Sequence, residues 1–146
     1  MTSPALTVYL ISRLYYAARS KIDSALADLG ITSVQYTVLS LLRGRDHLSS
    51  ADIARRYFVK PQSMNQIIFS LERLDLIVRN ADPDNRRILR VQLTEKGTTL
   101  LAACDERINR IEGAMLDGLS PEQVEAFRAT GFAILRNSYG RGEADS

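Results

Sequence analysis

The segment from Ala81 to Gly97 constrains the fold of this chain more than any other. It opens with Asp82-Pro83-Asp84-Asn85, a run of turn-forming residues, and Arg86-Arg87 follows directly. Leu89 to Leu93 is then a short strand candidate, and Thr94 is a good cap for a helix that begins after it. The segment therefore predicts a hairpin with an arginine-rich tip, joined without a spacer to a helix.

Cap residues and apolar spacing predict helices on both sides of this hairpin. Ser3-Pro4 is a serine cap followed by proline at the first helical position, and Thr32 with Gln35 is a capping box. Ser120 to Gln123 combines both signals, and we expect Asp75 to take the left-handed conformation that ends a helix. The predicted elements are helices over about 3–29, 32–44, 51–57 and 61–74, strands at 77–79 and 89–93, and two helices within about 95–139.

Length and composition describe one globular domain over residues 1–146, with a polar tail at 140–146. Hydrophobic residues make up 45% of the chain and charged residues 25%, so it can bury a core. The net charge of +2 is compatible with nucleic-acid binding but does not argue for it. A single cysteine, Cys104, and a single histidine, His47, exclude an internal disulfide and argue against a zinc site, so we expect no cofactor.

Other classes of protein are disfavoured. No apolar stretch approaches the ~20 residues of a membrane span, and the N-terminus lacks a signal-peptide pattern, so we expect a cytoplasmic protein. Scattered carboxylates and the lack of a Gly-rich phosphate loop predict no enzymatic activity. Cys104 lies in an apolar stripe between Leu101 and Ile108, which favours inert packing over a redox sensor.

The helix expected at 61–74 has two different faces. One side is apolar and would pack the helix down, and it consists of Met64, Ile67, Ile68, Leu71 and Leu74. The other side is rich in amides, and it carries Gln62, Gln66, Phe69 and Arg73, with Asn65 at its edge and Ser63 and Ser70 on its flanks. Amides can pair with adenine edges, arginine with guanine or phosphate, and serine with phosphate. The alternatives are a merely solvated face and, for Phe69, packing against a neighbouring side chain instead of a thymine methyl or a sugar.

The hairpin places basic residues next to this face, namely Arg79, Arg86, Arg87 and Arg90. Asp84 lies close enough in sequence to hold the guanidinium of Arg86. Arginine is attracted to narrow, A·T-rich minor grooves, whereas a surface salt bridge would be worth little. Two helices, a short turn and such a hairpin predict a mainly α fold with a small β-hairpin wing. This is a winged helix-turn-helix over about 32–94 that binds double-stranded DNA.

The chain resembles the MarR family of bacterial transcription regulators in two separate motifs. The run from Asp84-Asn85-Arg86-Arg87 to Leu93-Thr94-Glu95-Lys96-Gly97 is similar to the family's wing and next helix, and Leu29 to Leu39 is similar to its entry into the second helix. The helix order agrees over nearly the whole chain. Departures from the family pattern bear on the operator sequence rather than on the fold, and they are Phe58, Lys60, Gln66 and Phe69.

The resemblance implies a homodimer that reads a pseudo-palindromic operator, by default as a repressor, with half-sites about one turn (~10 bp) apart. Helices at about 3–29 and 95–139 would form the dimer interface. Their wide apolar stripes independently exceed what a small winged domain needs to cover. Release from DNA by a small phenolic or aromatic ligand is a further implication.

Candidate ligand-binding residues are those that could set an arginine or histidine beside aromatic rings, namely Arg13, Tyr15, Tyr16, Arg19, Tyr36 and His47. An arginine holds a carboxylate in a fork while tyrosine rings stack on an aromatic body. The alternative is core or dimer packing for the tyrosines and an ion pair across the interface for the arginines. A winged helix can also serve purely as a protein-interaction module without an effector, although an apolar patch would then be expected in place of the arginines and amides.

Overall fold

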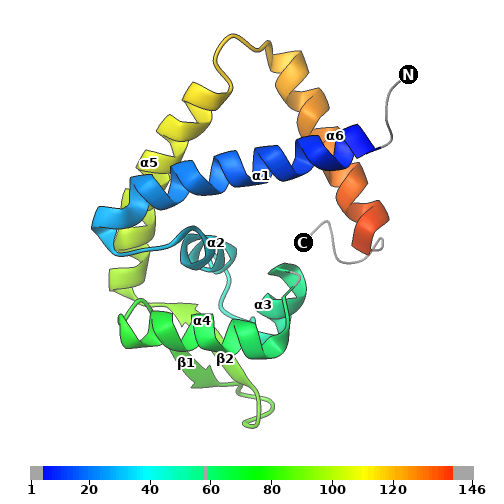
Figure 1. Cartoon of the computed structure of the whole chain (residues 1–146). Helices are drawn as coiled ribbons and strands as arrows, with labels where there is room; N and C mark the ends of the chain where they lie inside the picture. The colour runs from blue at the N-terminus through cyan, green and yellow to red at the C-terminus, as the bar shows by residue number, and fades with distance from the viewer. Residues whose placement is uncertain (1–4, 58, 140–146) are drawn as a thin grey trace.

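The computed structural model describes residues 5–57 and 59–139. Within them the chain forms α1 (Ala5–Leu26), the 3-10 helix η1 (Ala27–Leu29), α2 (Ser33–Leu41), α3 (Ser50–Tyr57), α4 (Pro61–Arg73), β1 (Ile77–Ala81), β2 (Leu89–Leu93), α5 (Glu95–Met115) and α6 (Pro121–Tyr139). The long helices α1, α5 and α6 form an open triangle above a smaller group made of α2, α3, α4 and the hairpin (Figure 1). The predicted mainly α fold with a β-hairpin wing is therefore confirmed.

Three predicted boundaries were wrong by a few residues. The first helix was expected to reach residue 29, but α1 ends at Leu26 and the tighter η1 follows, closed by Gly30 at φ 73°. The second helix was expected to reach Gly44, but α2 ends at Leu41 and a turn leads to Gly44 at φ 68°. In both places the chain tightens its last turn before it reverses, which apolar spacing does not reveal. Strand β1 is longer than predicted because Asn80 and Ala81 pair with β2.

The predicted caps are present where the residues are described. Thr32 and Gln35 form a reciprocal capping box at the start of α2, and Thr94 accepts a hydrogen bond from the Gly97 N–H at the start of α5. Ser120 and Gln123 bond each other's backbone N–H in the same reciprocal way. The Ser3-Pro4 cap, Phe58 in the predicted turn and the tail at 140–146 lie outside the described residues.

The core lies in the smaller group and against the ends of α1 and α5. Its most deeply buried side chains come from every one of those elements and include Leu26, Val38, Leu39, Ile53, Met64, Ile68, Leu71, Ile77, Val91 and Cys104. Burial of this set removes several hundred Å² of apolar surface from water and is the main favourable term for the fold. Helices α2, α3 and α4 and the hairpin are thus fixed on a common core.

The outer parts of the long helices carry exposed apolar side chains. On α1, Leu6 is 53% and Val8 67% exposed, and on α6, Phe127 is 60% and Phe132 50% exposed. None of the nineteen residues of α6 is buried. No helix in the described part of the chain is long and apolar enough to cross a membrane. A single chain therefore leaves an apolar surface on α1 and α6 that a protein partner would cover.

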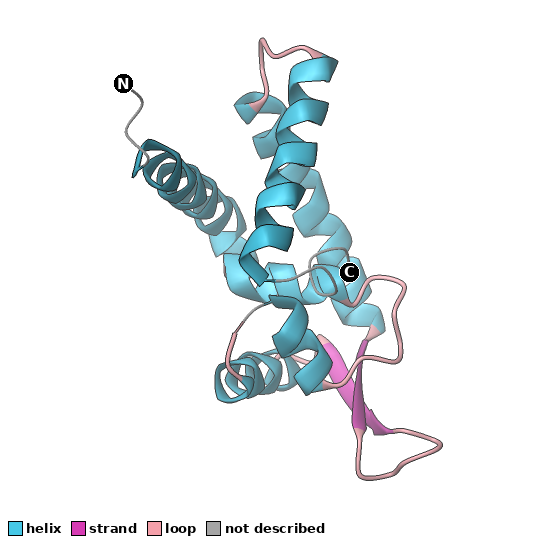
Figure 2. Ribbon diagram, turned by 90° about the vertical axis from the view of Figure 1, so that its right-hand side faces the viewer, coloured by secondary structure: helices cyan, strands magenta, loops and turns pink. Residues whose placement is uncertain are grey.

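The two strands pair antiparallel, from Ile77 with Leu93 to Ala81 with Leu89, and the turn between them extends away from the helices (Figure 2). The segment before α3 adds to this sheet, since the Val91 N–H donates to the Leu48 carbonyl at 2.7 Å. That pairing was not predicted because this segment lacks a strand pattern. It ties the wing directly to the helix-turn-helix.

A joint connects the end of α4 to the start of α5. The Thr94 N–H donates to the Leu76 carbonyl at 3.1 Å, the Thr94 hydroxyl to the Asp75 carbonyl at 2.7 Å, and Lys96 Nζ to the Leu74 carbonyl at 3.0 Å. Asp75 has φ 60°, the left-handed conformation predicted for it. Gly97 is packed on this turn so closely that an added Cβ would lie 2.0 Å from the Leu76 carbonyl oxygen.

We expect Gly97→Ala to lower the free energy of unfolding by about 3 kcal/mol, because the clash is with backbone that cannot move aside. Gly113→Ala on the same helix is the matched control. An added Cβ there meets nothing within 4 Å, and the higher helix propensity of alanine should stabilise the protein by up to ~1 kcal/mol. Urea unfolding at one fixed protein concentration measures both. Equal changes in the free energy of unfolding for the two substitutions would contradict the close packing of Gly97 on Leu76.

Candidate nucleic-acid interface

Helix α4 has the two faces predicted for it. Met64, Ile68 and Leu71 are buried, whereas the opposite side is exposed at Gln62, Ser63, Asn65, Gln66, Phe69 and Arg73. Leu74, predicted on the apolar side, is 42% exposed because it follows the last helical residue. The helix lies on the core with its amide-rich side free for a partner.

Phe69 does not pack into the protein. It is 54% exposed, and the guanidinium carbon of Arg73 lies 5.9 Å from the centre of its ring. This cation–π contact holds the arginine over the ring in the absence of a partner. The pair presents an apolar ring and a positive charge together at the middle and end of α4.

Ser70 was predicted as a phosphate contact, but its hydroxyl is used inside the domain. It donates to the Ile67 carbonyl at 2.6 Å and accepts from Gln35 Nε2 at 3.1 Å. The same Gln35 accepts from the Thr32 N–H at 3.0 Å. The capping box of α2 therefore also braces α4, and a half-buried hydroxyl with both functions satisfied is no longer a candidate contact.

The predicted ion pair between Asp84 and Arg86 does not form among the described residues, since the turn is organised by Asp82 instead. Its carboxylate accepts from the Asp84 and Asn85 N–H groups at 2.7 and 3.1 Å and from Arg90 Nε at 2.7 Å. These bonds, the one from Asp84 first, hold the pKa of the Asp82 carboxyl below its usual range. Arg90 is thus bonded within the hairpin, where its strands meet the turn.

Arg79, a predicted DNA contact, is also a brace. Its Nε donates to Glu72 Oε2 and its Nη2 donates to Glu72 Oε1, both at 2.9 Å. This paired contact joins β1 to α4, and it lowers the pKa of Glu72 chiefly through the hydrogen bonds from Arg79. This ion pair is one of the contacts that hold the wing against the helices.

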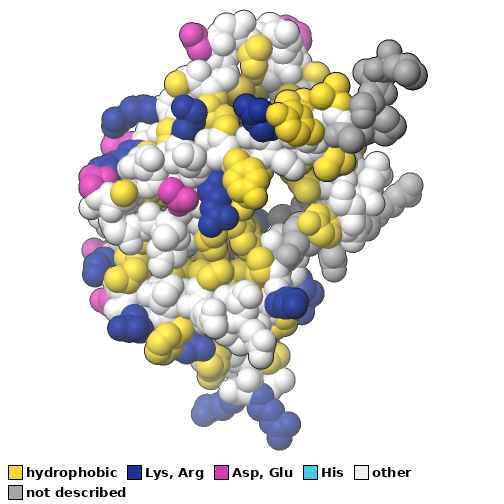
Figure 3. All heavy atoms as spheres, viewed as in Figure 1, with side chains coloured by type: hydrophobic (Ala, Val, Ile, Leu, Met, Phe, Trp, Pro, Cys, Tyr) yellow, Lys and Arg dark blue, Asp and Glu magenta, His cyan; other side chains and the backbone are white. Residues whose placement is uncertain are grey.

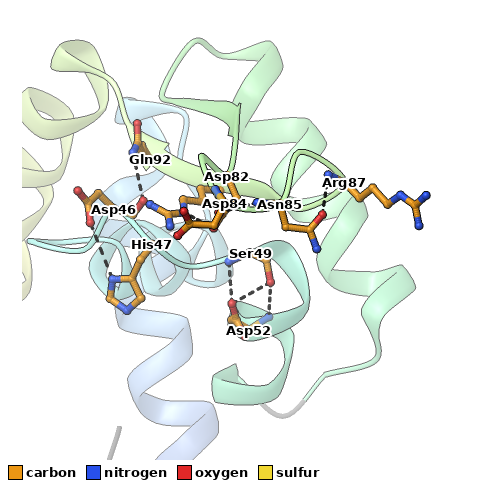
Figure 4. A network of polar contacts seen from close by, with 10 residues as sticks. Asp46, His47, Ser49, Asp52, Asp82, Asp84, Asn85, Arg87 and Gln92 are labelled. Atoms are coloured by element: carbon orange, nitrogen blue, oxygen red, sulfur yellow. Dashed lines mark hydrogen bonds and ion pairs between the residues drawn. The ribbon is translucent and has the colours of Figure 1, made fainter.

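The tip of the wing carries the two arginines that are not used as braces. Arg86 and Arg87 are both exposed, and within residues 5–57 and 59–139 neither side chain forms an ion pair. Arg87 extends away from the hairpin beside Asn85, which accepts its N–H at 3.2 Å (Figure 4). In the space-filling view Lys and Arg side chains stand at the free end of the wing (Figure 3).

The six candidate ligand residues do not come together in one site. Tyr36 donates its hydroxyl to Asp105 at 2.8 Å in the contact between α2 and α5. His47 lies in the loop before α3, where its side chain is 60% exposed and its Nδ1 is 3.9 Å from Asp46 (Figure 4). Arg13 donates to the Tyr9 hydroxyl at 2.8 Å, farther along α1.

Tyr15, Tyr16 and Arg19 do form a cluster on α1. Arg19 donates to the Tyr15 hydroxyl at 2.9 Å, and the two tyrosine rings meet edge to face at 5.4 Å. Arg19 also lies 3.7 Å from Asp23, which accepts the Ser33 N–H at 2.7 Å. That backbone bond is the main reason why the pKa of Asp23 is lowered. The cluster is thereby linked to the first turn of α2.

A cavity of about 370 Å³ adjoins this cluster between α1 and α2. Its lining consists of Arg19, Asp23, Ala27, Gly30, Ile31, Thr32 and Val34. Tyr57, at the end of α3, is affected by this cluster: burial raises the pKa of its hydroxyl, and the Tyr15 hydroxyl raises it further. Sequence reasoning missed Tyr57 because an aromatic residue at the end of a short helix is more often part of a core.

Comparisons with known proteins agree with this geometry. A family model described as the MarR family matches residues 29–88. The HTH-type transcriptional repressor Rv2887 of Mycobacterium tuberculosis is 30% identical over 120 residues, which cover 82% of this chain and 86% of that one. The chain belongs to the MarR family. It is accordingly a DNA-binding transcriptional regulator of the winged-helix type.

Solved structures of MarR-type regulators superpose over nearly the whole chain. CouR from Rhodococcus jostii RHA1, bound to p-coumaroyl-CoA, has a TM-score of 0.82 and 26% identity, covering 90% of this chain and 95% of CouR. MepR from S. aureus, in complex with DNA, has a TM-score of 0.82 and 25% identity, covering 93% and 99%. The agreement includes the long helices as well as the winged domain.

Cys104 of this MarR-family protein is fully buried in the core. Burial is the main cause that raises the pKa of its thiol, followed by the charge of Asp105. Both effects disfavour the thiolate, the reactive form of cysteine. The position therefore favours packing over redox sensing, as the sequence indicated.

Proposed function

We propose that this MarR-family protein is a homodimeric repressor that acts in the cytoplasm on a pseudo-palindromic operator. Helix α4 would enter the major groove and the wing an adjacent minor groove. The observation that carries the proposal is that only some arginines of the wing are bonded to carboxylates. Arg79 joins the wing to α4 through Glu72 and Arg90 closes the turn of the wing through Asp82, whereas Arg86 and Arg87 at its tip stay unpaired among the described residues. The complex of MepR with DNA supports this role.

The exposed apolar side chains of α1 and α6 support a homodimer. A second copy would bury the same side chains on both partners, because a two-fold interface is self-complementary. Two reading heads related by a two-fold axis then fit an operator with two-fold symmetry, with half-sites about one helical turn (~10 bp) apart.

We expect DNA binding to weaken steeply with salt, and Arg86→Ala/Arg87→Ala to make it weaken less steeply. The slope of log affinity against log salt should fall in magnitude by about 0.9 for each phosphate contact that is lost. The measurement is a salt series of fluorescence anisotropy on a duplex selected by the protein from a random library. The arginines contribute mainly affinity, so the selected sequence should change little.

The matched control is Arg110→Ala/Arg128→Ala, which removes the same charge from α5 and α6. It should leave the slope unchanged. Equal slopes for the wing variant and the wild type would refute a wing–DNA contact. If the affinity for DNA is absent, or does not change with salt, the result would instead favour the alternative, a winged-helix module that binds proteins.

We further propose that a small phenolic or aromatic acid binds beside Arg19 and lowers DNA affinity. The guanidinium has donors to spare beyond its bond to Tyr15, and tyrosine rings lie next to it. CouR, which binds p-coumaroyl-CoA, supports an effector with a phenolic ring. Such a ligand can lower DNA affinity only by the ratio of its affinities for the DNA-free and the DNA-bound protein.

We expect Arg19→Ala to keep DNA affinity within about twofold of the wild type and to lose the response to phenolic acids. A panel that includes 4-hydroxybenzoate and salicylate would be titrated against the protein–DNA complex. Arg13→Ala is the matched control, because Arg13 makes the same bond to a tyrosine four residues earlier in α1. A response that survives in Arg19→Ala, or that is lost equally in both variants, would argue against Arg19 as the anchor.

A further inference from the structure

Asn65 of α4 is held by a side chain of α3. Ser50 Oγ donates a hydrogen bond to Asn65 Oδ1 at 2.6 Å. Ser50 is half-buried and Asn65 is exposed. The carboxamide of Asn65 is therefore not a free rotor on the reading face, since its oxygen is turned back toward α3.

The Ser50 hydroxyl is available for this contact because a neighbour caps the helix. Ser49 accepts the Asp52 N–H at 3.1 Å, and Asp52 accepts the Ser49 N–H at 2.9 Å, so the start of α3 is satisfied without Ser50. The separation of 2.6 Å between Ser50 and Asn65 is typical of an O–H···O bond and is short for N–H···O. The distance is consistent with Oδ1 as the inward atom, and with this orientation Nδ2 points outward.

The outward Nδ2 of Asn65 donates no hydrogen bond within the described part of the chain. Gln62 and Gln66, the other amides of the reading face, are exposed and have no partner in the same residues. Their two amide atoms can both turn toward a base. Asn65 thus differs from its neighbours in what it can offer.

We propose that Asn65 reads DNA as a donor only and selects guanine over adenine, an inference that rests on the function proposed above. A paired contact with adenine needs the amide oxygen to accept from N6 while the nitrogen donates to N7. The bond from Ser50 removes the oxygen from that geometry. Guanine offers two acceptors side by side, N7 and O6, to the remaining N–H groups. Ser50 is then a positioning residue that sets base preference without touching the base.

The experiment is selection of operators from a random duplex library by the full-length protein and three variants. Asn65→Ala identifies the base pair in each half-site that depends on Asn65, because preference disappears there. The wild type should prefer guanine at that position by about tenfold. Ser50→Ala should release the amide and shift the preference to adenine, whereas Ser50→Thr keeps a hydroxyl and should keep guanine.

Adenine at that position in the wild type would overturn the proposal. So would a preference that Ser50→Ala leaves unchanged, or Asn65→Ala enriching the same sequence as the wild type. Thermal unfolding of Ser50→Ala should match that of the wild type, because the cap at Ser49 is intact. If no sequence is enriched by the wild type, the proposed function itself fails. An enriched operator with the wrong base fails only the inference about Asn65.

Discussion

The close approach of Gly97 to the Leu76 carbonyl is the contact on which the arrangement of the molecule depends. Because Gly97 has no side chain, the first turn of α5 lies directly on the turn that ends α4, where Thr94 and Lys96 bond the adjoining carbonyls. The reading helix, the first strand of the wing and a long helix of the upper triangle all meet there. The start of α5 and the end of α4 are therefore in direct contact.

The arginines of the wing fall into two groups, those bonded to a carboxylate and those at its exposed tip. Arg79 is bonded to Glu72 and so joins β1 to α4, whereas Arg90 is bonded to Asp82 within the hairpin and holds its turn. All four side chains are half-buried, and both pairs are formed without Arg86 or Arg87. Arg86 and Arg87 can contact DNA phosphates without breaking either of these ion pairs. Polar contacts also link α1 to α4 in steps, through Asp23 to the start of α2 and through Gln35 to Ser70.

Much of the fold followed from local signals. Caps at Thr32, Thr94 and Ser120, the turn at Asp82 and the two faces of α4 are each encoded within a few residues, and each was predicted. What failed depends on partners outside the local pattern: Asp82 is bonded by Arg90 from the other strand of the hairpin, and Ser70 is bonded by Gln35 from α2. Spacing along a chain shows which side chains share a face. It does not show which of them are already engaged by another element.

We propose that two copies of the winged domain, held together by the long helices, bind one symmetric operator. The most direct test is the affinity for selected operators in which the spacing between half-sites is changed by one to five base pairs. We expect one optimal spacing near one helical turn, two chains bound per duplex, and a loss of affinity of at least about tenfold when five base pairs are inserted. Affinity that does not depend on spacing, or a single half-site that binds one chain as tightly as the full operator, would contradict it.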